Sequence, residues 1–175
     1  MKNVMNAIMQ ENRFVSLYTD EKDSSKFIFG KIIALDDVYF AFSSISPNGD
    51  DDGIIIMQIE RVYRVETQSK YEQKMLTLMK AKGIKETNDL VDTQDVLLHY
   101  LFAAKKSGRI VSIEINESGY EDILGYIASI EDNICCINQI DLYGKCDGKS
   151  YIRLSDISQF EYGSDEEKQI ELLLQ

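Results

Sequence analysis

Short apolar runs alternate with clusters of Gly, Asp and Asn along the whole chain. Runs rich in Ile, Val, Tyr and Phe that end at turn-forming residues about every 8–12 positions are typical of the strands of a small all-β barrel. The pattern predicts five strands in each half. They are Phe14–Tyr18, Phe27–Leu35, Val38–Ile45, Ile54–Ile59 and Val62–Glu66, then Ile110–Ile115, Ile123–Ile130, Asn133–Ile140, Ser150–Leu154 and Ile157–Tyr162.

Helical spacing flanks each set of strands. The clearest case has Val96, Leu97, Tyr100, Leu101 and Ala104 on one face, as in an amphipathic helix. Four helices are predicted, at Val4–Glu11, Tyr71–Lys82, Asp95–Lys106 and Asp165–Leu174.

The ends of two of these helices have recognisable caps. Gly83 follows the second helix as a C-terminal cap. Ser164 precedes the last helix with Glu167 three residues on, the spacing of a capping box, and Ser69 stands at the matching place before the second helix.

The two halves repeat one another at an offset of 95 residues. Within 28–66 and its counterpart, 9 of 39 positions are identical, where average composition gives about two or three. Arg13–Leu17 also matches Arg109–Ile113, at an offset of 96. The repeat predicts two small domains, 1–82 and 95–175, joined by a polar linker at 83–94.

Composition and charge narrow the class of protein. Apolar residues make up 44% of the chain and charged residues 28%, which is ordinary for a globular protein. The N-terminus lacks the pattern of a signal peptide and no apolar run reaches the length of a membrane span, so we expect a cytoplasmic protein without membrane contact. Of the net charge of −11, residues 95–175 carry −8, so this half repels phosphate backbones. Either the charge only maintains solubility, or acidic residues such as Glu166 and Glu167 dock on a basic partner.

The three cysteines all lie in the second half and have no cysteine counterparts in the first. Two, Cys135 and Cys136, are adjacent on a predicted strand, where neighbouring side chains point to opposite faces. We interpret these two and Cys146 as small buried apolar residues rather than a disulfide or a metal site.

A helix, five short strands, a glycine in the second strand and an acidic residue at the next turn resemble the Sm-like fold, closest to its bacterial RNA-chaperone branch. Gly30 with Asp36, and Gly125 with Asp132, are the matching residues in the two halves. The resemblance implies a mainly β protein of two tandem Sm-like (SH3-like) five-stranded barrels, each with a leading and a trailing helix. The chain also resembles small proteins of low-GC Gram-positive bacteria with which no activity is associated.

The RNA-binding signatures of that family are missing. Its third strand carries an asparagine that reads bases, whereas the residues here are Val38–Phe42 and Ile134–Ile137. Its Ile-x-Gly signature is absent, and Ile59–Arg61 and Leu154–Asp156 stand in place of the bacterial Tyr-Lys-His motif. The resemblance therefore carries over a fold, not an RNA site.

One loop matches part of a calcium-binding pattern. Asn48, Asp50 and Asp52 have the spacing of the first three ligands of an EF-hand, but Ile59 stands where its glutamate belongs, and strands rather than helices flank it. We therefore expect no metal. The Gly-x-x-Asp-Gly pattern common to both halves predicts hairpin turns, made by Gly49, Asp52, Gly53, Gly144, Asp147 and Gly148.

Basic and aromatic residues alternate around the end of the first set of strands. Such a mixture suits stacking and phosphate contacts, although a solvated face with half-buried tyrosines is the favoured explanation. This partner or nucleic-acid surface consists of Arg61, Arg64, Tyr63, Lys70 and Tyr71.

No constellation of nucleophile, base and orienting group is found, and no phosphate or dinucleotide motif. We expect no enzymatic activity and no cofactor. The preferred hypothesis is a cytoplasmic adaptor or regulatory module that binds a protein. The alternatives are a divergent Sm-like RNA-binding protein that uses the first barrel, and a homodimer or larger oligomer formed through strand edges.

Overall fold

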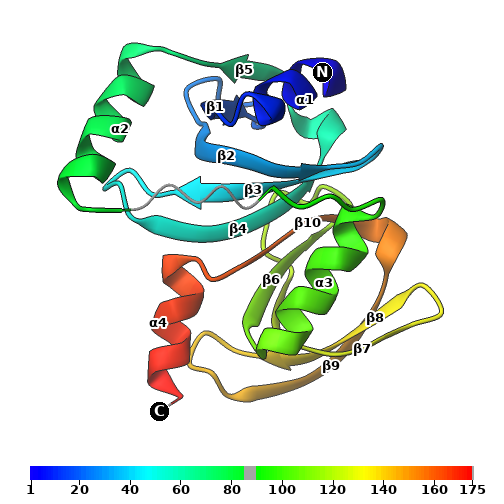
Figure 1. Cartoon of the computed structure of the whole chain (residues 1–175). Helices are drawn as coiled ribbons and strands as arrows, with labels where there is room; N and C mark the ends of the chain where they lie inside the picture. The colour runs from blue at the N-terminus through cyan, green and yellow to red at the C-terminus, as the bar shows by residue number, and fades with distance from the viewer. Residues whose placement is uncertain (85–89, 175) are drawn as a thin grey trace. The chain divides into compact units, whose positions relative to one another are not determined.

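The computed structural model describes residues 1–84 and 90–174 (Figure 1). Within them lie ten strands, four α-helices and two 3-10 turns, so the prediction of a mainly β protein is confirmed. None of the helices in this described part is long and apolar enough to cross a membrane.

The chain divides into two compact units. The first comprises Met1–Gly53 and Met57–Val96, and the second Ile54–Ile56 and Leu97–Gln175. The predicted linker falls partly on 85–89, outside the described residues. Beyond it, the Val91 N–H donates to the Ile33 carbonyl at 2.8 Å and the Val96 N–H to the Asp36 carboxylate at 2.7 Å, so this stretch is held against the first unit.

The first unit is an antiparallel sheet with helices packed on it. Its strands are hydrogen-bonded in the order β5-β1-β2-β3-β4. The elements are α1 (Lys2–Gln10), β1 (Phe14–Tyr18), β2 (Ile28–Leu35), β3 (Tyr39–Ile45), β4 (Asp51–Gln58), the 3-10 turn η1 (Ile59–Arg61), β5 (Arg64–Glu66) and α2 (Lys70–Ala81).

The second unit repeats that order as β10-β6-β7-β8-β9. Its elements are α3 (Val96–Ser107), β6 (Ile110–Ile115), β7 (Ile123–Glu131), β8 (Ile134–Ile140), β9 (Cys146–Arg153), the 3-10 turn η2 (Leu154–Asp156), β10 (Ile157–Tyr162) and α4 (Asp165–Leu173). Every predicted strand and helix overlaps an observed one.

Strand pairing in the two units has the same register. Val15 lies opposite Gly30 as Val111 lies opposite Gly125, and the register shift after Ile32 in β2 recurs after Ile127 in β7. A residue of either sheet therefore has a structural counterpart in the other, at the offset found in the sequence.

A closed barrel is not shown. In neither unit do the described residues pair the first and last strands of the order with each other. A 3-10 turn follows the fourth strand and leads the chain to the far edge, where the fifth strand pairs with the first. Each sheet is thus open.

The helix caps follow the sequence prediction. Ser69 and Ser164 both form capping boxes, with Glu72 and Glu167 at the third helical position. Gly83 has a φ of 71° at the end of α2, where the Ile84 N–H donates to the Met79 carbonyl at 3.1 Å, so the glycine cap is confirmed.

Candidate functional site

The trailing helices α2 and α4 rest on their sheets through a buried glutamate. Glu72 is 2% exposed, and its Oε1 accepts a hydrogen bond from the Ser16 hydroxyl of β1 at 2.7 Å. Its other oxygen accepts the Ser69 N–H. One side chain therefore caps α2 and also ties it to β1.

The counterpart of Glu72 in the second unit, Glu167, accepts fewer hydrogen bonds. Glu167 is 1% exposed, and its Oε2 accepts the Ser164 N–H at 2.8 Å. Its Oε1 has no partner at hydrogen-bond geometry among the described residues. Burial raises the pKa of Glu167, and the Ser164 N–H and the nearby Ser112 hydroxyl offset part of that rise. Glu167 is too deeply buried for the acidic docking role that the sequence suggested for it.

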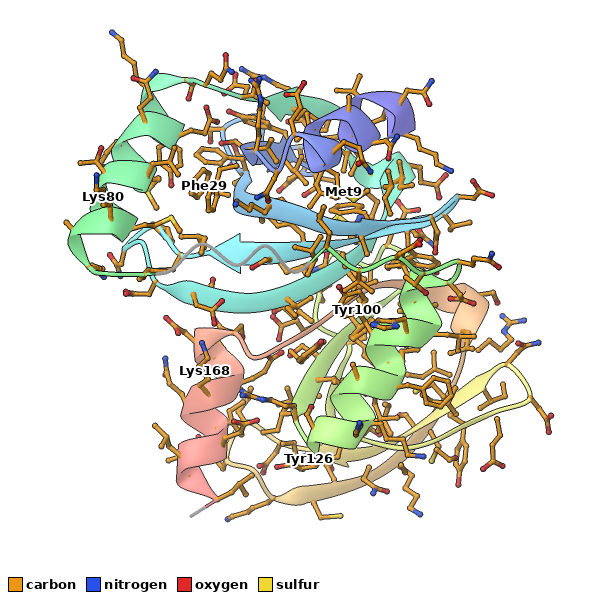
Figure 2. All side chains as sticks on the ribbon, in the orientation of Figure 1. Met9, Phe29, Lys80, Tyr100, Tyr126 and Lys168 are labelled. Atoms are coloured by element: carbon orange, nitrogen blue, oxygen red, sulfur yellow. The ribbon has the colours of Figure 1, made fainter. Side chains whose placement is uncertain are left out.

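In the first unit, large side chains fill the space between α2 and the sheet. Phe29, Ile45, Met75 and Met79 form a buried cluster, with Phe14, Phe27, Tyr71 and Ile84 packed against it (Figure 2). The Tyr71 ring meets that of Phe27 edge-on at 4.8 Å. At the end of the helix, Lys82 Nζ binds both carboxylate oxygens of Asp50 at 2.7 Å. This corner of the first unit is therefore filled and closed by an ion pair.

The same positions of the second unit hold smaller or polar residues. Phe29 corresponds to Leu124, Phe27 to Asp122 and Tyr71 to Glu166. Leu174, the counterpart of Met79, is 45% exposed, whereas Met79 is 4% exposed. The apolar side of α4 is consequently only partly covered.

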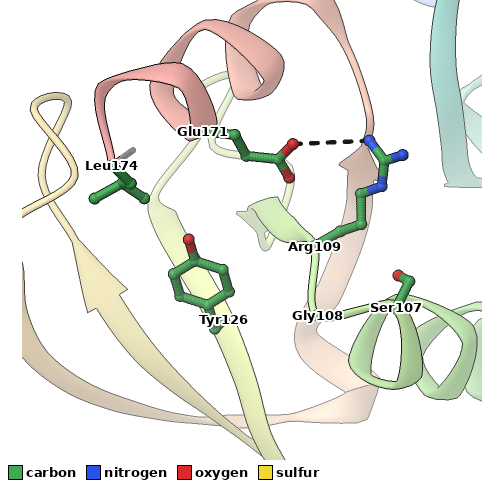
Figure 3. A pocket seen from close by; sticks show the side chains of 6 residues that line it. All are labelled: Ser107, Gly108, Arg109, Tyr126, Glu171 and Leu174. Atoms are coloured by element: carbon green, nitrogen blue, oxygen red, sulfur yellow. Dashed lines mark ion pairs between the residues drawn. The ribbon is translucent and has the colours of Figure 1, made fainter.

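A shallow cavity of about 350 Å³ lies in the second unit, between α4, β7 and the end of α3 (Figure 3). Its lining includes the Tyr126 ring, Leu174 and the Arg109 guanidinium, with Ser107, Gly108 and Glu171 completing it. Arg109 lies 3.8 Å from the Glu171 carboxylate. Burial, and then the charge of Glu171, raise the pKa of Tyr126. The cavity therefore places the apolar side chains of Tyr126 and Leu174 beside the Arg109 guanidinium, which is only weakly paired with Glu171.

Leu174, which lines this cavity, is one of five exposed apolar residues at the β8–β9 turn and the end of α4. We call the five residues Leu142, Tyr143, Leu172, Leu173 and Leu174 the open corner. They are between 45% and 73% exposed, and the first two form the β8–β9 turn while the others end α4. The turn and the helix end are adjacent, because a Cβ on Gly144 would collide with the Leu174 side chain.

Two aspartates of the loop with calcium-like spacing have other structural roles. Asp50 is bound by Lys82, and Asp52 lies within β4 rather than in a loop. In the described chain, no three His, Cys, Asp or Glu residues are grouped so that they could hold a metal ion.

The turn prediction needs a correction for four of its six residues. Gly49 and Gly144 do lie in turns, closed by Ser46–Asp50 and Asp141–Lys145 hydrogen bonds of 2.9 Å. Asp52 with Gly53, and Asp147 with Gly148, instead lie inside β4 and β9. Gly148 has a φ of 92° where the β8–β9 register shifts by one residue, so this Asp-Gly pair marks a β-bulge.

Only some of the predicted basic and aromatic residues are exposed. Arg64 lies over the Tyr18 ring at 4.3 Å and pairs with Glu66, and Tyr63 lies beside the same ring. Lys70 is exposed at the start of α2, and Arg61 lies half-buried in η1. Tyr71 packs against the aromatic cluster and is only partly exposed.

The cysteines differ from one another. Cys135 and Cys136 are buried, and burial raises the pKa of Cys135 to about 11. Cys146 is exposed at the start of β9, so the expectation of a buried residue is wrong there.

Sequence reasoning missed the open corner and the cavity. The signal was a comparison of the two halves position by position, in which Pro47 and Asn48 become Leu142 and Tyr143. The large apolar residues that replace Pro47 and Asn48 at this turn are both more than 70% exposed.

Three comparisons with known proteins complete the description of this site. No protein-family model, curated protein or solved structure matches the chain. The interpretation therefore rests on the geometry of the two units.

Proposed function

We propose that the protein is a non-enzymatic cytoplasmic adaptor that binds a protein partner through the open corner of its second unit. The observation that carries the proposal is the contrast between two copies of one fold. At this corner of the first copy Met79 is buried in the cluster with Phe29, Lys82 pairs with Asp50, and the exposed positions hold Pro47, Asn48 and Thr77. The second copy leaves Leu142, Tyr143 and the end of α4 exposed.

A group of large exposed apolar side chains is a usual mark of a protein-binding surface. Tyr143 supplies a large amphipathic ring, the residue type over-represented at interface hot spots. Nucleic acid is a poorer fit, because residues 95–175 carry a net charge of −8.

Each unit, in this proposal, is an open form of the Sm-like or SH3-like barrel. The strand order with the fifth strand beside the first supports it, as does the glycine in the second strand of each sheet. The fold likeness implies no ring and no RNA site.

The test replaces corner residues with those that the first copy uses. Asn48 and Thr77 occupy the positions of Tyr143 and Leu172, so the variant is Tyr143→Asn with Leu172→Thr. We expect protein captured from native cytosol by the purified full chain to fall about tenfold or more. Val38→Ala, at an exposed turn of the first unit, is the matched control and should leave capture unchanged.

Equal capture by all three proteins contradicts the proposal. So does co-purification of nucleic acid that disappears in the Arg61→Ala, Arg64→Ala variant, since that result supports RNA binding by the first unit.

A further inference from the structure

The outer edge of β9 adjoins the open corner and has the features of a strand-binding site. Resting on the function proposed above, we propose that β9 accepts an extended acidic segment of the partner as an additional antiparallel or parallel strand. Strand β9 ends the order β10-β6-β7-β8-β9 within its unit, and in the described residues no strand follows it. Backbone N–H and C=O groups along such an edge are free to pair with an added strand.

The side chains of β9 divide into two faces. Ile152 is buried on the inner face, where it lies opposite Cys135 of β8. Lys149, Tyr151 and Arg153 share the outer face, because alternate residues of a strand point the same way. Tyr151 is 70% exposed there. An added strand would thus lie beside Ile152, the one buried residue of β9, on one face and beside a basic and aromatic row on the other.

The positive charges beside this edge favour pairing with an acidic strand. Lys145 and Lys149 are exposed, and no carboxylate of the described chain lies within ion-pair distance of either. Arg153 is paired with Asp156 at 2.6 Å. Two exposed lysines stand out because residues 95–175 carry a net charge of −8, and they oppose carboxylates favourably across a strand pair.

The same lysines argue against a second copy of this chain. Edge lysines are a common protection against self-pairing, since like charges meet across the new ladder. An acidic strand avoids that repulsion, so the edge discriminates between the two occupants.

The edge continues into the open corner through the β8–β9 turn. Leu142 and Tyr143 lie just before Lys145 in the chain and are both exposed. An acidic strand on β9 with an apolar residue beyond its end would therefore bind both surfaces at once.

A direct test uses synthetic peptides of about ten residues, the length of a long strand. The probe is a blocked, fluorescein-labelled peptide of alternating Glu and Val that ends in Leu, titrated with the full chain and followed by fluorescence anisotropy. We expect the Lys145→Glu, Lys149→Glu variant to weaken binding about tenfold or more, and rising salt to weaken binding to the unsubstituted chain. Lys70→Glu with Lys74→Glu makes the same change in net charge on α2 and should leave binding unchanged.

Two further peptides and one oligonucleotide test the mode of binding. A Lys-Val peptide that binds as tightly would overturn the charge argument. A Glu-Val peptide of equal charge in which every backbone amide is N-methylated has no N–H to donate to a ladder, and equal binding by it would overturn strand addition. Tighter binding of a single-stranded oligouridine, with the same dependence on Lys149, would replace the acidic strand by nucleic acid.

Amide hydrogen exchange separates strand addition from loose charge contact. Binding of the Glu-Val peptide should slow exchange in residues 146–153 at least about tenfold, and unchanged exchange there would overturn the inference. The two proposals fail differently. If native capture depends on Tyr143 and Leu172 but not on Lys145 and Lys149, the adaptor function stands and the acidic strand fails; if capture ignores the corner, the function itself fails.

Discussion

At the scale of single residues, the two buried glutamates occupy equivalent positions but accept different numbers of hydrogen bonds. Both cap a helix, and both lie beneath it against a serine of the first strand of the sheet. Glu72 uses both carboxylate oxygens, whereas Oε1 of Glu167 is left without a partner in the described residues. A buried, unsatisfied polar group costs about 1–3 kcal/mol.

Replacing that carboxylate by an amide should therefore stabilise the protein. Glu167→Gln keeps an oxygen for the Ser164 N–H and removes the buried charge, so we expect a gain of about 1 kcal/mol in the free energy of unfolding at pH 8. Urea denaturation followed by circular dichroism measures it.

The gain should depend on pH. Because burial raises the pKa of Glu167, the folded state holds this proton to a higher pH than the unfolded state. The cost of the charge is absent below the unfolded pKa and grows as pH rises toward the folded pKa. The stabilisation by Glu167→Gln should thus be smaller at pH 5 than at pH 8.

Glu72→Gln is the control, and it should destabilise the protein because Glu72 accepts two hydrogen bonds. Equal effects of the two substitutions would show that the buried carboxylates are equivalent.

At the scale of the elements, the glycine of the second strand determines how closely two strands pack. A Cβ on Gly30 would overlap the Ser43 carbonyl oxygen, and a Cβ on Gly125 would overlap that of Asn138. Backbone cannot move aside as a flexible side chain can.

Either glycine-to-alanine substitution should destabilise its unit by about 1–3 kcal/mol, the usual cost of forcing extra atoms into a packed site. Gly119→Ala makes a useful comparison, since a Cβ there meets no atom within 4 Å although its φ is 80°. Thermal unfolding should show a larger loss for Gly125→Ala than for Gly119→Ala. The opposite order would mean that backbone conformation, not close approach, explains the strand glycine.

Most of the helices, strands and helix caps were predictable from the sequence, because residues close together in the chain determine them. The strand β1 and the capping boxes follow from periodicity and from Ser and Glu at fixed spacing. The Asp-Gly pairs were assigned to turns, since the residues that form a bulge and those that form a turn are the same. The partner of Glu72 on β1 could not be foreseen, because Ser16 is brought to it only by tertiary packing.

At the scale of the whole molecule, the two units are unequal versions of one fold. The first has a filled aromatic cluster beneath α2, and the second has a cavity, an unsatisfied carboxylate and most of the negative charge. Fewer buried apolar contacts make a region open at lower free energy.

The second unit should accordingly unfold first. With increasing urea, amides of α4 and β6 should exchange before those of α2 and β1, as measured by mass spectrometry of deuterated peptides. A single transition for all four elements would show instead that the chain unfolds as one cooperative body.

The candidate site was not predictable from either half alone. Leu142 and Tyr143 look like ordinary apolar residues beside a turn, and Leu172–Leu174 look like a helix face. Their role becomes apparent only when the structure shows that all five are exposed. In the first unit Met79 is buried and Leu78 half-buried, and the exposed counterparts are Pro47, Asn48 and Thr77 rather than large apolar residues.

The shared register of the two sheets also bears on how the chain reaches its native state. While the chain is unfolded, β1 can meet β7 in the same alignment that it uses with β2, because the hydrogen-bonding pattern is the same in both pairs. Tandem copies of one fold are prone to such crossed assembly. The reverse pairing, of β6 with β2, would place Lys31 opposite Ile110 and remove its ammonium group from the Phe14 ring, over which it lies at 4.5 Å. Divergence between the copies thus protects each from capture by the other during folding, besides giving the second its exposed surface.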